Sequence, residues 1–285
     1  MMTATLDAAH LQTWVGKTMR SDDLITPQLI RAFRATLDRK IGEPKSGDLA
    51  PHAIHWCLSQ PTVPMHEIGE DGHPARGGFL PPVPLPRRMW AGGRLAFHAP
   101  LHIGDEVERV STVKSISVKE GKSGTLCFVL VEHRCSTKRG LALVEEHDIV
   151  YRGAETGGDN APAKPDDLPK ADVTRGMDAT PALLFRYSAL TFNGHRIHYD
   201  RDYVTKVEGY PGLIVHGPLQ ATLLVDLAST MQPKKSLSKF SFRAVKPLFD
   251  GGPFSVNGAM NDDKHAKLWT ASANGAHMLA DADWN

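Results

Sequence analysis

The segment Gly217–Met231 constrains the fold more than any other part of the chain. Its sequence, GPLQATLLVDLASTM, places apolar residues on almost every face of a helix. A helix that is apolar all round has to be enclosed by other elements, and a sheet wrapped around it would do this. Pro218 fits the first helical turn, where its missing N–H removes no hydrogen bond. We therefore predict a helix over residues 216–231 that begins near His216 or Gly217.

Strand-like stretches, in which β-branched residues often alternate with polar ones, lie on both sides of the predicted linker described below. Alternation with a period of two is typical of half-buried strands. Residues 119–124 supply a turn, so the strands of the first half are expected to form an antiparallel meander. The predicted strands are residues 107–118, 125–135 and 143–152 in the first half, and 238–245, 254–260, 267–273 and 276–280 in the second.

Residues 153–172 are rich in Gly, Pro, Asp and Ala and have no apolar period, which predicts a linker. The linker divides the chain into an N-terminal domain, residues 1–152, and a C-terminal domain, residues 173–285. An internal repeat supports two copies of one unit. Residues 95–104 and 242–251 share Pro-Leu-x-x-Gly and an apolar residue five positions before the proline.

Three further segments of the first half have a recognisable pattern. Residues 51–59 predict a buried helix ahead of the first sheet, matching the order helix then sheet in the second half. Thr26 is a suitable N-cap for another helix that begins at Pro27. Residues 61–86 carry seven prolines and four glycines and predict a long ordered loop that could line a substrate channel.

Composition excludes several classes of function. The formal net charge is +1, with 33 Lys plus Arg against 32 Asp plus Glu, so no global field favours nucleic acid or an anionic membrane. Cys57, Cys127 and Cys135 form neither an even set nor a CxxC pair, which disfavours disulfides and a structural zinc site. No secretory signal is recognisable, and no stretch approaches eighteen apolar residues. We expect a protein of the reducing cytoplasm.

The densest cluster of polar side chains is residues 191–200, TFNGHRIHYD. Three interpretations compete. Asn193 and the glycine after it suit a type I′ turn between two strands, which would leave the histidines on a solvated face. His195, His198 and Asp200 are residue types that bind metals, but no second spaced set of His, Cys or Glu completes a coordination shell.

The third interpretation is an acid–base site that faces the start of the helix at Gly217, where free backbone amides can bind an anion. Here the residues resemble the R-specific enoyl-CoA hydratases, or MaoC-like dehydratases, of the hot-dog fold. The motif of that family runs G-D-x-N-P-x-H and is followed by a His-Gly pair at the start of the central helix. His198 matches the histidine of the motif, and His216 and Gly217 match the pair.

Three positions depart from the family motif: its catalytic aspartate falls on Asn193, its asparagine on His195 and its proline on Arg196. These departures resemble the branch near 3-hydroxyacyl-thioester dehydratase type 2 and the mesaconyl-CoA or itaconyl-CoA hydratases, and residues 14–16 and 79–90 look like that branch too. The resemblance covers the whole chain. It implies an α+β double hot-dog fold, in which two antiparallel sheets each wrap a central helix and only the C-terminal domain is catalytic.

The implied reaction is the reversible addition of water to a 2-enoyl-CoA, most readily a short dicarboxylic one such as mesaconyl-CoA or itaconyl-CoA. We expect His198 to move the protons, Asn193 to orient the water through its amide, and the Gly217 N–H to bind the thioester oxygen. Coenzyme A enters as part of the substrate, and no further cofactor and no metal are expected. The residues expected to contact substrate are His195, Arg196, Tyr199 and His216.

Two other functions stay open on the sequence: an acyl-CoA thioesterase, and a non-catalytic protein that binds acyl thioesters. The carrier, CoA or acyl carrier protein, is open as well, and both a monomer and a homodimer of the double unit are compatible with the pattern. Arg196, Arg186 and Arg243 are candidates to bind a free carboxylate of the substrate, because a guanidinium pairs with carboxylate bidentately. Candidates to contact the CoA phosphates are Lys206, Lys234, Lys235 and Arg201.

Overall fold

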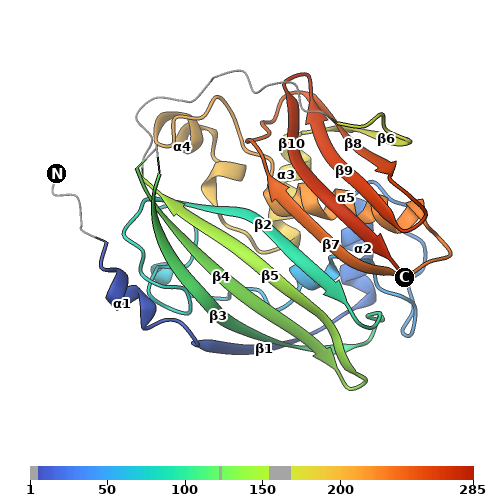
Figure 1. Cartoon of the computed structure of the whole chain (residues 1–285), viewed down its shortest axis with the longest axis horizontal. Coiled ribbons are helices and arrows are strands. Elements are labelled where there is room, and N and C mark those ends of the chain that lie inside the picture. The colour runs from blue at the N-terminus through green and yellow to red at the C-terminus, as the bar shows by residue number, and fades with distance from the viewer. Residues whose placement is uncertain (1–5, 122–123, 154–167) are drawn as a thin grey trace.

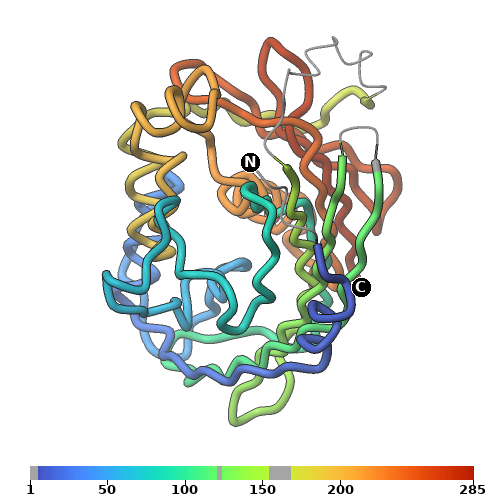
Figure 2. Tube along the Cα trace, turned by 90° about the vertical axis from the view of Figure 1, so that its left-hand side faces the viewer, coloured from blue at the N-terminus to red at the C-terminus, as the bar shows by residue number. Residues whose placement is uncertain are grey.

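The computed structural model describes residues 6–121, 124–153 and 168–285. Ten strands within these ranges form one antiparallel sheet in the order β1-β3-β4-β5-β2-β7-β10-β9-β8-β6, with the helices gathered on one side of it (Figures 1 and 2). The strands are β1 (Thr18–Leu24), β2 (Arg87–Phe97), β3 (Glu106–Gly121), β4 (Gly124–Thr137), β5 (Gly140–Arg152), β6 (Val173–Asp178), β7 (Leu237–Ala244), β8 (Pro253–Met260), β9 (His265–Ser272) and β10 (Gly275–Trp284). The helices are α1 (Ala8–Gln12), α2 (Pro27–Thr36), α3 (Pro181–Leu190), α4 (Arg201–Lys206) and α5 (Gly217–Met231), with short 3-10 turns η1 (Ile54–Cys57), η2 (Met65–Glu67) and η3 (Arg196–His198).

The order of the strands is the same from either edge, since β1-β3-β4-β5-β2 repeats as β6-β8-β9-β10-β7. Matching hydrogen bonds support this repeat. The Gly104 N–H donates to the carbonyl of Ile25 at 2.7 Å, and at the equivalent place the Gly251 N–H donates to the carbonyl of Ala179 at 3.2 Å. Gly104 and Gly251 are the last residues of the two repeated segments that were predicted from the sequence. Two copies of one unit therefore build the chain.

Helices α2 and α3 are equivalent elements of the two copies. Each begins with a Thr-Pro pair, and the hydroxyl of the threonine accepts a hydrogen bond from the third helical amide, so Thr26 and Thr180 are N-caps. The predicted cap at Thr26 is confirmed. The two helices pack against each other and cover the side of the molecule opposite the sheet (Figure 2).

Helix α5 is enclosed as its composition predicts. It packs against β7, β8, β9 and β10, and most of its residues between Leu219 and Ala228 are buried. Its two buried polar side chains are hydrogen-bonded: Gln220 accepts from the Thr270 hydroxyl at 2.6 Å, and Thr222 pairs with the Tyr187 hydroxyl at 3.0 Å. The helix can be buried on all sides because no polar group on it is left without a partner at that depth.

Two details of the predicted architecture are wrong. The strands form one sheet, not two, because β2 and β7 pair and thereby remove two exposed sheet edges. Gly92 permits this junction, since a Cβ there would lie 2.5 Å from the carbonyl oxygen of Phe242. The helix predicted at residues 51–59 is only the single turn η1, because Ala53 adopts a left-handed backbone with φ 66° and interrupts any helix through it.

Of the predicted linker, residues 154–167 lie outside the described residues; β5 ends at Arg152 and β6 begins at Val173. In the described part of the chain, no helix has the length and apolar character needed to cross a membrane. Residues 61–86, the predicted loop, run from the first half toward the second and lie between the helices and the sheet (Figure 2). This path brings the loop to the polar cluster at residues 191–200.

Candidate functional site

His198 ends the turn η3 and is 6% exposed. Its Nδ1 lies 2.7 Å from the carbonyl oxygen of Ile214, and because a carbonyl only accepts, Nδ1 carries the proton. The other ring nitrogen, Nε2, is then an unprotonated acceptor. Burial lowers the pKa of His198 to about 3, so the ring is neutral near pH 7 and Nε2 can take a proton.

His216 lies directly against His198. The two rings stack with centroids 3.6 Å apart and planes 19° from parallel, and the Nε2 of His216 is 2.8 Å from the Ser188 hydroxyl. Burial, and then the neighbouring His198, place the pKa of His216 well below its ordinary value. His216 is fully buried, and its side chain does not cap an amide of α5. Its ring therefore acts as a packing surface that holds the ring of His198 in place.

Asn193 follows α3 and is half-buried. Its Oδ1 accepts a hydrogen bond from the His195 backbone N–H at 3.0 Å. Its Nδ2 donates to none of the residues that the structure describes, which leaves two N–H groups for a water or a substrate. The interpretation of Asn193 as a hairpin turn between two strands is wrong, because α3 precedes it and η3 follows it.

Gly217 is the first residue of α5, as predicted. Within the described residues, its backbone N–H has no hydrogen-bond partner. A Cβ at this position would meet nothing nearer than 3.9 Å, where the Met278 methyl and the Trp90 carbonyl oxygen lie. The amide therefore has room beside it, and the dipole of a fifteen-residue helix favours negative charge there.

The other three predicted residues take different places. The His195 ring lies 5.5 Å from that of His198 and meets it edge to face. Tyr199 is half-exposed and donates to the carbonyl of Gly194 at 3.1 Å. Arg196 is held by Asp200, with Nη2 and Oδ2 2.7 Å apart, so its charge is already paired.

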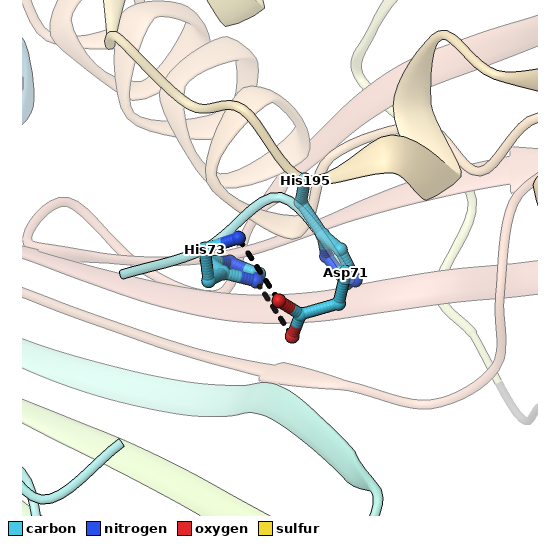
Figure 3. A group of neighbouring side chains, drawn as sticks. All are labelled: Asp71, His73 and His195. Carbon is cyan, nitrogen blue, oxygen red and sulfur yellow. Dashed lines mark hydrogen bonds and ion pairs between the residues drawn. The ribbon is translucent and has the colours of Figure 1, made fainter. Parts of the chain in front are cut away.

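A carboxylate that no sequence motif indicates stands beside this cluster (Figure 3). Asp71, from the proline-rich loop, accepts hydrogen bonds from the His73 backbone N–H at 3.0 Å and the His73 ring at 3.3 Å. The His73 ring lies 4.1 Å from the His195 ring. Burial alone would raise the pKa of Asp71, but the bonds from His73 outweigh it and hold the pKa below its usual range. Asp71 is a carboxylate at neutral pH.

Two glycines allow the loop to come so close. A Cβ on Gly72, whose φ is +87°, would lie 1.9 Å from the carbonyl oxygen of Gly194. The two backbones also share a hydrogen bond of 2.9 Å from the Arg196 N–H to the Asp71 carbonyl. The only sequence signal for this contact is the Asp-Gly-His run inside a loop of unusual length.

A metal ion would find three ligand atoms here, because those of Asp71, His73 and His195 lie within 4.8 Å of one another. The set weighed from the sequence, with Asp200, is not assembled, since Asp200 caps α4 and pairs with Arg196. The Arg88 guanidinium lies close enough to lower the pKa of both His73 and His195. A fixed cation at that range opposes a second cation, so the group fits proton chemistry better than metal binding.

The cations proposed from the sequence lie elsewhere or are paired. Arg186 and Arg243 are exposed, on α3 and β7. Lys206, Lys235 and Arg201 form ion pairs with aspartates.

Comparison with known proteins relates the chain to a set of thioester hydratases and dehydratases. Residues 52–250 match the family model described as hydroxyacyl-thioester dehydratase type 2. The mesaconyl-C(4)-CoA hydratase of Chloroflexus aurantiacus is 44% identical over 262 residues, which cover 91% of this chain and 92% of that protein.

Solved structures agree on the fold. A MaoC-like dehydratase from Phytophthora capsici has a TM-score of 0.71 at 14% identity and covers 98% of this chain and 99% of its own. A double hot-dog protein from Mycobacterium tuberculosis has a TM-score of 0.57 at 14% identity, with 95% and 96% covered. The double hot-dog fold predicted from the sequence is confirmed.

Proposed function

The chain belongs to the hydroxyacyl-thioester dehydratase type 2 family, and we propose that it adds water reversibly to a short dicarboxylic 2-enoyl-CoA such as mesaconyl-CoA or itaconyl-CoA. It is an enzyme of the hydro-lyase class, as the resemblance implied. One observation carries the mechanism: His198, with a free Nε2, is held near the start of α5 through the ring of His216, the residue before Gly217.

His198 is the proposed base. Its Nε2 takes a proton from water, the resulting hydroxide adds to the β-carbon, and the same nitrogen returns the proton to the α-carbon. One base suffices because the proton leaves the water and reaches the α-carbon on the same face of the double bond. General acid–base catalysis of this kind contributes about 10²- to 10⁴-fold to a rate.

The Gly217 N–H is the proposed donor to the thioester oxygen, which gains negative charge as water adds. The amide has no competing partner among the described residues, and the axis of α5 starts at this point. One such donor is worth about 3 to 4 kcal/mol of transition-state stabilisation where it has been measured. Asn193 is proposed to hold the attacking water through Nδ2.

We assign to Asp71 the negative charge that Asn193 lacks. Asp71 orients His73 through two hydrogen bonds, and the His73 ring packs on His195. When His198 is protonated during turnover, a carboxylate in the same cluster of rings stabilises the new positive charge. Asp71 and His73 are positioning residues in this scheme, since no contact of theirs reaches the reacting atoms.

The remaining expectations are part of the same proposal. Coenzyme A enters only as part of the substrate, with no separate cofactor. The domains are residues 1–152 and 173–285, the second being catalytic, and the double unit can pair further as a homodimer. Three unpaired, buried cysteines, Cys57, Cys127 and Cys135, are consistent with a reducing compartment such as the cytoplasm.

Incubation of the purified protein with mesaconyl-CoA and with crotonyl-CoA tests the function. The expected result is loss of the absorbance of the conjugated thioester without release of free thiol. Release of thiol would make the protein a thioesterase, and binding with no change in either signal would make it a binding protein. Both results contradict the proposal.

A further inference from the structure

Arg88 lies on the inner face of the first-half sheet, beside the candidate site. Its Cα partner across β2 and β5 is Tyr151, whose side chain is fully buried. Arg87, one residue earlier, points the other way, as neighbours on a strand do, and pairs with Glu208. The side chains of the two adjacent arginines therefore lie on opposite faces of the sheet.

The start of α5 is close to Arg88. Trp90 is two residues further along β2, and its carbonyl oxygen lies 3.9 Å from the position of a Cβ on Gly217. Two residues of a strand span about 7 Å, which is near the length of a four-carbon dicarboxylic acyl group. Arg88 also lowers the pKa of His73 and His195, so its charge reaches the polar cluster.

The guanidinium of Arg88 has no carboxylate partner among the described residues, although it is half-buried. Arg76, in the preceding loop, differs from Arg88 in this respect, because its guanidinium donates hydrogen bonds to three backbone carbonyls. The Tyr151 hydroxyl is buried beside Arg88, close enough for the guanidinium to lower its pKa, and no acidic side chain among the described residues bonds to it. A guanidinium and a phenol that lie together without an acidic partner leave donors and a positive charge that an anionic ligand can satisfy.

We propose that Arg88 and Tyr151 bind the free carboxylate of the dicarboxylic substrate and so set the specificity of the enzyme. The inference rests on the proposed hydratase function. Arg88 takes the carboxylate in a bidentate pair and Tyr151 donates to one of its oxygens. A monocarboxylic acyl group such as crotonyl leaves both groups unpaired, so it is selected against.

The test compares kcat/KM for mesaconyl-CoA and crotonyl-CoA in Arg88→Gln, Tyr151→Phe and the wild type. Arg88→Gln is expected to lose about 100-fold on mesaconyl-CoA, as for a desolvated charge pair that loses one partner. Tyr151→Phe removes only the hydroxyl and is expected to lose about 10-fold on the same substrate. The expected signature in both variants is a fall in the ratio of kcat/KM for mesaconyl-CoA to that for crotonyl-CoA, because crotonyl-CoA has no carboxylate for either group to bind. Arg94→Gln is the control, because Arg94 lies on β2 but faces outward and pairs with Glu146 and Asp148.

Equal losses on the two substrates, or no loss on mesaconyl-CoA, would overturn the inference. If Arg88→Gln does not fold, Tyr151→Phe decides by the same criterion. A wild type that hydrates crotonyl-CoA but not mesaconyl-CoA overturns the inference and leaves the hydratase function standing. A wild type that hydrates neither overturns the proposed function, and the inference falls with it.

Discussion

Four imidazoles in ring contact form the centre of the candidate site, and their charge states decide what they can do. His73 and His195 lie 4.1 Å apart, His195 and His198 5.5 Å, and His198 and His216 3.6 Å. Burial lowers the pKa of all four rings. The row of rings is therefore neutral at rest, and in the proposed mechanism the Asp71 carboxylate balances the single proton taken up in turnover.

Replacement of His198 by glutamine tests the base. Gln keeps most of the buried volume and can donate to the Ile214 carbonyl, but it cannot accept a proton at neutral pH. We expect kcat to fall by about 100-fold or more with the fold retained. His98→Gln is the matched control, because the side chain of His98 is exposed. Steady-state hydration assays and circular dichroism on both variants make the measurement, and near-normal turnover in His198→Gln would exclude His198 as the base.

Replacement of Asp71 by asparagine tests the carboxylate contributed by the first half. Asn keeps an acceptor for His73 but removes the charge, so the protonated ring formed in turnover loses its counter-ion. We expect kcat to fall about 10-fold or more and the acid limb of its pH profile to shift. Glu70→Gln removes a charge from the adjacent, exposed side chain and should leave the profile unchanged. An unaltered pH profile in Asp71→Asn would assign Asp71 a structural role only.

At the scale of elements, the loop of residues 61–86 reaches the candidate site through a contact between backbones. Gly72 and Gly194 meet so closely that a Cβ on either would approach the carbonyl oxygen of the other within 2.7 Å or less. The loop replaces, in the first half, the long central helix that the second half has in α5. Seven prolines between residues 61 and 86 disfavour a helix there, because each proline removes a backbone donor.

Substitution of Gly72 by alanine tests this contact. Gly72 has φ +87° and its Cβ would clash with Gly194, whereas Gly77 has φ +93° and would meet only Pro82, at 3.6 Å. Both alanines carry the strain of a left-handed backbone, about 1 to 2 kcal/mol, but only the one at residue 72 displaces the loop from the site. We expect kcat/KM to fall far more in Gly72→Ala than in Gly77→Ala at similar melting temperatures. Equal activities in the two variants would argue against a role for the crossing.

Periodicity located the elements well where each had a pattern of its own. All seven predicted strands and the helix at residues 216–231 correspond to observed elements, within a few residues except at the end of β10. Strand β2 was missed because Gly92 and Gly93 interrupt its alternation, and these glycines are there for the close approach of β7. Asp71 was missed for a related reason: no motif records a contact such as that of Asp71 with Arg196, 125 positions apart in different copies of the repeat. Asn193, His198 and Gly217 could be proposed from the sequence because the family motif spaces them along one stretch of chain.

For the whole molecule, neutral buried histidines link stability to pH. Burial lowers the pKa of His133 to about 3 and of His147 to about 4, and His198 behaves like His133. In the unfolded chain these rings titrate near their ordinary value of about 6.5. Below that pH the unfolded state binds protons that the folded state does not, so the free energy of unfolding falls as the pH falls. Asp283 raises the pKa of the exposed His265, so this ring makes the folded protein more stable as the pH falls. Its contribution to the free energy of unfolding is small because solvent screens the pair.

Urea unfolding at pH 7.5, 6 and 5 is therefore expected to show a progressive loss of stability, with a slope of about 1.4 kcal/mol per pH unit for each neutral histidine once the pH is well below the ordinary histidine pKa. The loss continues toward the folded-state pKa values near 3 and 4 and is fully reversed above pH 7. His147→Gln removes one neutral buried histidine, so the slope of the unfolding free energy against pH should decrease by the contribution of about one proton. Surface His10→Gln, on α1, should leave the slope as it is. Stability independent of pH between 7.5 and 5 would mean that these rings are protonated in the folded protein, and the neutral His198 on which the proposed base depends would have to be abandoned.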